Sequence, residues 1–227
     1  MIIANRKPFE EIKAMVAPFS RILILGCGTC VTVDFSGGEK QVGILAAELR
    51  MARQLEGKPL ETVEHTVQRQ CEWEFIDPIA EMVRGVDAVL SMACGVGVQA
   101  MAERYPDKII LPALNTVMMG MPIEAGVFVE RCAGCGDCVL AFTGGICPIA
   151  RCSKNLLNGP CGGSQNGKCE VNPEIDCAWH LIYEKLKAMG RLDALMEIRG
   201  PKDWRPAGGG GPRKIIREEE RLETLEA

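Results

Sequence analysis

The sequence predicts an α/β fold: a small open parallel sheet with helices on both faces, followed by a loop-rich, cysteine-dense domain and C-terminal helices. Short apolar runs alternate with stretches of helical spacing from about residue 20 to residue 125. Glycine, proline, asparagine and cysteine dominate residues 131–176, and helical spacing returns after Cys177. Strands that alternate with helices favour a parallel sheet, because right-handed crossovers place the helices on its faces.

Each element of the predicted sheet follows from its local pattern. Residues 21–26 form a continuous apolar run that ends at a glycine, which is typical of a buried parallel strand. Further strands are expected at 62–68, 87–93 and 108–111. Between the strands, apolar residues recur every three or four positions, which predicts helices at 38–55, 75–84 and 96–105.

We therefore divide the chain into three parts. Residues 1–125 form the α/β domain, residues 126–200 the cysteine-dense domain, and residues 201–227 a linker with a C-terminal helix. Apolar spacing predicts one helix at 178–189 and another, exposed, at 214–225. The glycines at 208–211 predict a flexible connection between them.

Composition excludes several classes of protein. The chain has 227 residues, of which 47% are hydrophobic, enough for a substantial core. There are 26 Lys and Arg residues against 30 Asp and Glu residues, so no positive excess marks a nucleic-acid or membrane-surface partner. No apolar run approaches the roughly 20 residues of a membrane span, and no export signal is visible. We expect a cytoplasmic protein.

Cysteine is the most informative residue type. In a reducing compartment disulfides are uncommon, so metal ligation is the leading explanation for twelve cysteines. Eight of them fall in one loop-rich segment: Cys132, Cys135, Cys138, Cys147, Cys152, Cys161, Cys169 and Cys177. The first three are separated by two residues each, a spacing that lets thiolates converge on one iron–sulfur cluster. Eight thiols are enough for two [4Fe-4S] clusters, which makes this an iron–sulfur domain.

Two other interpretations of the late cysteines stay open. A pair of zinc sites, each with four cysteines, would organise such a segment equally well. Zinc ribbons usually show two separate Cys-x-x-Cys pairs, however, and the overlapping triplet favours iron–sulfur clusters. A disulfide scaffold is the third interpretation, and the reducing compartment counts against it.

The other four cysteines follow the predicted strands. Cys27 and Cys30 come after the first strand, Cys71 after the second and Cys94 after the third. Because the carboxyl ends of parallel strands meet at one edge, which is where such sheets bind ligands, these thiols are expected to lie together. Four thiols complete the shell of a third [4Fe-4S] cluster or of a zinc ion, with Asp34 as an oxygen ligand in reserve.

Three competing interpretations apply to these early cysteines. The Gly-Cys-Gly sequence at residues 26–28 begins like a dinucleotide-binding fingerprint, but its third glycine is absent. Cys27 and Cys30 have the spacing of a thioredoxin-like pair, which needs a helix that starts at the first cysteine. The β-branched residues at 31–33 disfavour that helix. Finally, a buried cysteine, above all Cys71, can act simply as a small apolar residue.

The late segment resembles a known family. The run RCAGCGDCVLAFTGGICPIARCSKNLLNGPCGGSQNGKCEVNPEIDCAWHLIYEKL, followed by DWRP, is similar to the methylenetetrahydrofolate reductase C-terminal domain found in MetV subunits of acetogen-type enzymes. The earlier blocks GCGTC, RQC and ACGVGVQ resemble the rest of such subunits. The resemblance extends to the ligand role of all twelve cysteines.

The resemblance implies an iron–sulfur subunit that passes electrons to the flavin of a MetF-type flavoprotein. That partner reduces methylenetetrahydrofolate to methyltetrahydrofolate in the one-carbon metabolism of acetogenesis, the Wood–Ljungdahl pathway. The implied electron donor is ferredoxin or a heterodisulfide-reductase-like complex. The chain itself has no flavin motif and no evident acid–base residues, so we expect a non-catalytic conductor. The alternative is a zinc-stabilised scaffold that positions the catalytic partner without conducting electrons.

Overall fold

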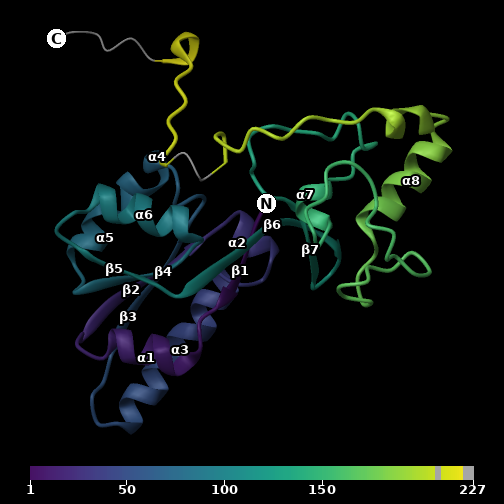
Figure 1. Ribbon diagram of the computed structural model, residues 1–227. Coiled ribbons are helices and arrows are strands. Elements are labelled where there is room, and N and C mark those ends of the chain that lie inside the picture. The colour runs from purple at the N-terminus through teal and green to yellow at the C-terminus, as the bar shows by residue number, and fades with distance from the viewer. Residues whose placement is uncertain (208–210, 222–227) are drawn as a thin grey trace. The chain divides into compact units, whose positions relative to one another are not determined.

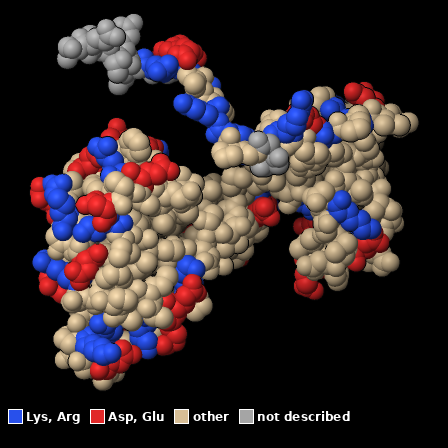
Figure 2. All heavy atoms as spheres, turned by 60° about the vertical axis from the view of Figure 1, so that its left-hand side comes forward, with Lys and Arg blue, Asp and Glu red and all other residues tan. Residues whose placement is uncertain are grey.

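The computed structural model describes residues 1–207 and 211–221. The chain divides into two compact units, the first comprising Met1–Glu130 and the second beginning at Arg131. On the face drawn in Figure 2, basic and acidic side chains are interspersed, so neither sign forms a continuous patch there. Within the described residues, no helix is both long enough and apolar enough to cross a membrane.

The first unit contains the predicted parallel sheet. Its strands are β2 (Arg21–Cys27), β3 (Glu61–Val67), β4 (Ala88–Met92) and β5 (Ile109–Pro112), in the order β3-β2-β4-β5. All three pairings are parallel. The four predicted strands are thus confirmed, with ends displaced by a residue or two. Six consecutive residues of β2 are buried, as expected for a central strand covered on both faces.

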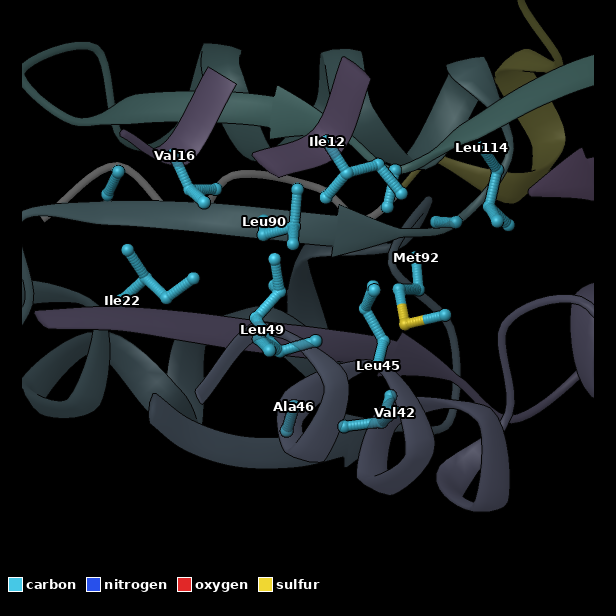
Figure 3. Close-up of a cluster of buried hydrophobic side chains, with 14 of the residues drawn as sticks. Ile12, Val16, Ile22, Val42, Leu45, Ala46, Leu49, Leu90, Met92 and Leu114 are labelled. Atoms are coloured by element: carbon cyan, nitrogen blue, oxygen red, sulfur yellow. The ribbon is translucent and has the colours of Figure 1, made fainter. Parts of the chain in front are cut away.

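Helices cover both faces of this sheet (Figure 1). On one face, α1 (Phe9–Val16) and α3 (Glu39–Leu55) pack against Ile22 and Leu90. Figure 3 shows Leu49 of α3 directed toward Leu90 of β4. On the other face, the cluster around Leu23 and Val89 takes side chains from α4 (Trp73–Ile76), α5 (Ala80–Arg84) and α6 (Gly95–Arg104). Alternate strand residues therefore face two separate apolar clusters.

The helix predicted at 75–84 is wrong as a single element. The structure has α4, a 3-10 turn η1 (Asp77–Ile79) and α5 in succession. Pro78 explains the break, because proline has no N–H to donate and its ring obstructs the preceding turn. The β-branched segment after Cys30 departs from expectation too, since it forms the short helix α2 (Cys30–Val33).

A second sheet was not predicted. It consists of β1 (Ile2–Arg6), β6 (Leu114–Glu124) and β7 (Val127–Cys132), in the order β1-β6-β7. β1 and β6 are antiparallel, with Ile2 opposite Met119 and Arg6 opposite Leu114. The strands at the two ends of the first unit thus pair with each other.

The second unit has little regular structure in its described part. Its elements are α7 (Pro148–Arg151), α8 (Ala178–Ala188) and the 3-10 turns η2 (Leu192–Met196) and η4 (Glu218–Glu220). The helix α8 confirms the prediction at 178–189. The helix predicted at 214–225 is wrong over 214–217, which is not helical, and residues 222–225 lie outside the described part. The linker predicted at 208–211 likewise lies almost wholly outside it.

Candidate functional site

The four early cysteines lie at the carboxyl edge of the parallel sheet. Cys27 is the last residue of β2, and Cys30 is the first of α2. Cys71 lies in the loop between β3 and α4, and Cys94 is the N-cap of α6, directly after β4. Cys27 is buried, Cys71 is exposed, and the other two are partly buried. The helix α2 begins at the second cysteine of the Cys-x-x-Cys pair, so the thioredoxin-like arrangement is absent.

The thiols of Cys27, Cys71 and Cys94 lie near enough to influence one another. Partial burial raises the pKa of the Cys71 thiol, and the charges of Cys27 and Cys94 raise it further. The rise has a simple cause, since neighbouring thiolates repel one another in a partly desolvated place. A bound cation removes that repulsion, so the donor chemistry of this edge fits a metal.

Gln70 fixes the loop that carries Cys71. Its side chain is completely buried. The Nε2 group donates hydrogen bonds to the carbonyl oxygens of Leu25 (2.7 Å) and Gly26 (3.0 Å), and Oε1 accepts one from the Ser91 hydroxyl (2.6 Å). The residue before Cys71 is therefore tied to β2 and β4 at once. Sequence reasoning missed this role, because nothing about a lone glutamine reveals which carbonyl groups it will meet.

Two further hydrogen bonds tie the second sheet to the loops that carry Cys30 and Cys94. The buried Asp34 accepts from the Ala4 N–H of β1 (2.7 Å) and, through its other oxygen, from the Ser36 N–H (3.0 Å) and hydroxyl. Both carboxylate oxygens are engaged in the fold, so the ligand role held in reserve for Asp34 is withdrawn. Thr116 of β6 accepts from the N–H of Gly95 (2.8 Å), the residue after Cys94.

The late cysteines lie on the loops and helix ends of the second unit. Cys132 is the last residue of β7, and Cys135 and Cys138 follow it in a loop. On either side of Cys135, Gly134 and Gly136 have φ values of 61° and 77°, so the chain turns sharply around this thiol. Cys147 and Cys177 are the N-caps of α7 and α8, and Cys152 is the C-cap of α7.

Several polar groups contact the late sulfur atoms. The N–H of Gly134 donates to Cys132 Sγ and the N–H of Ala150 to Cys147 Sγ, both at 3.4 Å. The Ser153 hydroxyl lies 3.4 Å from Cys169 Sγ. This hydroxyl and the backbone N–H groups of residues 171 and 172 lower the pKa of Cys169. Donors of this kind stabilise thiolates, the form that binds iron and zinc.

The sidechain of Glu170 joins two of the cysteine loops. Cys161 Sγ donates to Glu170 Oε1 at 3.1 Å, and Lys154 forms an ion pair with the same oxygen. Both charged partners are partly exposed. This contact brings the loop around Cys161 beside the loop that carries Cys169. In this contact the Cys161 thiol keeps its proton and donates it to Glu170. To bind a metal, Cys161 would have to lose that proton and leave Glu170.

The arrangement does not gather a complete ligand shell. All twelve cysteines are free. Across residues 1–207 and 211–221, no three His, Cys, Asp or Glu side chains lie close enough to hold one ion. The donor chemistry fits iron–sulfur clusters or zinc, but the thiols must draw together to bind either. Such coupling of binding to local folding is common where the ligands lie on loops.

A pocket lies beside Cys177, the one cysteine among its lining residues. A cavity of about 450 Å³ is lined by Cys177, Trp179, His180 and Tyr183, together with the loop at 164–167. His180 is exposed on α8 and acts on the Asp176 carboxylate, whose pKa it helps to lower, and His65 lies on β3.

Comparison with known families gives one match. Residues 111–205 match the family described as methylene-tetrahydrofolate reductase C terminal. The matched stretch begins in β5, contains all eight late cysteines and ends at Arg205. It relates this part of the chain to methylenetetrahydrofolate reductase. Neither the curated proteins nor the solved structures gave a match.

Proposed function

We propose that the protein is an iron–sulfur electron-transfer subunit of a methylenetetrahydrofolate reductase complex, similar to MetV. In this proposal it passes electrons to the flavin of a MetF-type flavoprotein, which reduces methylenetetrahydrofolate to methyltetrahydrofolate. The electrons come from ferredoxin or from a heterodisulfide-reductase-like complex. The observation that carries the proposal is the coincidence of the family match with the eight free thiols of the second unit.

The proposal assigns the twelve thiols to two regions. The eight late thiolates would hold two [4Fe-4S] clusters, and such clusters supply one-electron transfer when bound. Their N–H and hydroxyl donors at Cys132, Cys147 and Cys169 would stabilise the thiolate form. Cys27, Cys30, Cys71 and Cys94 would hold a third cluster or a zinc ion at the sheet edge. The pairing of individual late cysteines is left open.

Metal analysis of the anaerobically purified full chain tests this assignment. We expect about eight iron atoms per chain if the early site holds zinc, and about twelve if it holds a cluster, at four irons per cluster. Dithionite reduction should give a low-temperature paramagnetic signal. A colourless chain that contains zinc and no iron would replace the proposal with the zinc-stabilised scaffold.

An electron-transfer assay with the partner protein distinguishes an electron-transfer subunit from a scaffold subunit. The chain, a MetF-type flavoprotein and a reduced low-potential donor are combined anaerobically, and flavin bleaching is followed. The double variant Cys135→Ser/Cys138→Ser should still bind the partner but abolish bleaching. Glu184→Gln, at an exposed residue of α8, is the control and should bleach at the wild-type rate. Wild-type chain that binds the partner without bleaching its flavin would count against conduction.

A further inference from the structure

A segment late in the second unit lies across the loop that carries Cys132, Cys135 and Cys138. It runs from Glu197 to Pro206 and includes the sequence DWRP. Arg199 and Asn158 exchange two hydrogen bonds, from Arg199 N to Asn158 Oδ1 (2.8 Å) and from Asn158 Nδ2 to Arg199 O (2.9 Å). Pro206 packs so closely on Gly136 that a side chain at Gly136 would collide with it. We call residues 197–206 the strap.

Lys202 is the charged residue through which the strap reaches the cysteine loop. Its side chain is only 2% exposed. The ammonium group donates to the carbonyl oxygen of Asp137 (2.5 Å) and lies 3.1 Å from the Asp137 carboxylate. The same carbonyl oxygen accepts a contact from Cys135 Sγ at 3.6 Å. A single oxygen atom thus separates the buried cation from a thiol of the triplet.

Burial makes this cation different from the other lysines near late cysteines. Lys154 and Lys168 have side chains that are 41% and 47% exposed, and each pairs with a carboxylate. Water screens charges at such places, so they act weakly on a nearby group. The carboxylate of Asp137 is 54% exposed and therefore hydrated, whereas the ammonium of Lys202 is not. The hydrated carboxylate therefore offsets only part of the charge of Lys202 at the sulfur atoms.

We propose that Lys202 is a positioning residue that raises the reduction potential of the cluster held by Cys132, Cys135 and Cys138. This inference rests on the proposed function. Reduction by a one-electron donor adds one negative charge to the cluster, with no bond broken and no proton required. A dry cation beside one of its thiolates stabilises that added charge more than it stabilises the oxidised form. The strap, held by Asn158, keeps the cation in place.

The test is a redox titration of the anaerobic full chain, followed by electron paramagnetic resonance. Lys202→Met keeps the aliphatic stem and removes the charge. We expect the equilibrium constant for reduction of one cluster to fall at least tenfold, which is about 59 mV for one electron. The second cluster should be unchanged. Lys187→Met, at an exposed lysine of α8, is the matched control and should leave both potentials at the wild-type values.

A second variant covers the case in which Lys202→Met fails to bind iron. Asp137→Asn removes the negative partner and leaves the cation, so the potential of the same cluster should rise. A fall or no change in Asp137→Asn overturns the inference, as does an iron-loaded Lys202→Met with wild-type potentials. Wild-type protein without any paramagnetic signal would instead overturn the proposed function itself, so the two failures are distinguishable.

Discussion

In the first unit, apolar clusters pack against both faces of the parallel sheet, whereas the second unit has one small cluster around α8. The first clusters include completely buried residues of the central strands β2 and β4 and of helices on both faces. The second consists of Cys177, Trp179, Ile182 and Leu186 with a few partly buried neighbours. Burial of apolar surface is the main source of stability in a metal-free domain. The first unit can therefore fold on its core, whereas the second has little apolar core to hold it.

The thiols of the two units differ in the same way. Those of the first unit sit at the ends of strands and helices, and Gln70 and Asp34 hold the connecting loops in place. In the second unit, half of the thiols lie in loops, and the other half lie at the ends of β7, α7 and α8. Ligands on anchored loops need less ordering than ligands on free loops, although the described residues of neither unit already form a complete shell.

Removal of metal should produce the largest difference between the two units in their protection from amide hydrogen exchange. After iron and zinc are stripped by an anaerobic chelator, we expect residues 132–177 to lose all protection from amide hydrogen exchange. The strands β2 and β4 should keep theirs, because their buried cores need no metal. Structural metal sites contribute on the order of 10 kcal/mol to folding, which is enough for complete local unfolding.

Mass spectrometry of peptides from both units measures this difference in one sample. Reloaded protein serves as the control and should recover protection in residues 132–177. If both units lost amide protection equally, or both kept it, the second unit would not depend on metal more than the first.

Gln70→Ala should loosen the loop that carries Cys71 from the carboxyl ends of β2 and β4 in the first unit. The substitution leaves the Leu25 and Gly26 carbonyl groups and the Ser91 hydroxyl without their buried partner. We expect a loss of about 1–3 kcal/mol in the stability of β2 and β4, seen as faster amide exchange. Metal retention at Cys71 should fall as well, while iron in the second unit should not.

The control for this prediction is Gln99→Ala, at an exposed glutamine of α6. Surface substitutions of this kind usually change stability by less than about 0.5 kcal/mol. If both variants exchanged alike, Gln70 would not be the residue that holds the edge.

Asp87→Asn should have the smallest effect on stability, and that effect should be limited to the first unit. The backbone N–H groups of Arg21 and Ser20 donate to this carboxylate and lower its pKa. A carboxyl group with a lowered pKa in the folded state stabilises the fold above its ordinary pKa. That contribution disappears as the pH falls through the lowered value. Wild type should therefore exceed Asp87→Asn slightly in stability at neutral pH, and the difference should vanish in acid.

Amide exchange of β2 at a series of pH values, corrected for intrinsic rates, checks this result. Asp107→Asn, at an exposed aspartate of the same unit, is the control. A difference that grew as the pH fell would refute the assigned sign.

Local patterns were sufficient to predict the parallel sheet. The apolar runs of β2 and β4 and the helical spacing of α3 each carry their own signal, and the structure confirms them. The second sheet had no such signal, because β1 pairs with β6 from the far end of the unit. Pro122 and Gly120 within β6 also weaken its strand pattern. Pro78 interrupts the helical spacing of residues 75–84, so that the pattern does not give a single helix.

Of the candidate site, only the cysteines could be predicted from the sequence. The position of the early cysteines after the strands follows from the geometry of parallel sheets, and the structure places them there. The residues that act on the thiols could not be found in this way. Gln70, Thr116 and Lys202 reach their partners through contacts that depend on the tertiary fold. The grouping of late cysteines stays a prediction.

The pairing of β1 with β6 also sets an order of events during translation. β1 is synthesised before β6, whose partner residues Leu114–Met119 follow the whole parallel sheet in the chain. Until then Ala4 has no neighbouring strand to hold it against Asp34. The segment that follows Cys30 therefore lacks its contact with a paired β1 while the chain is being synthesised. If the proposed metal site at the sheet edge is correct, its loading follows the synthesis of β6.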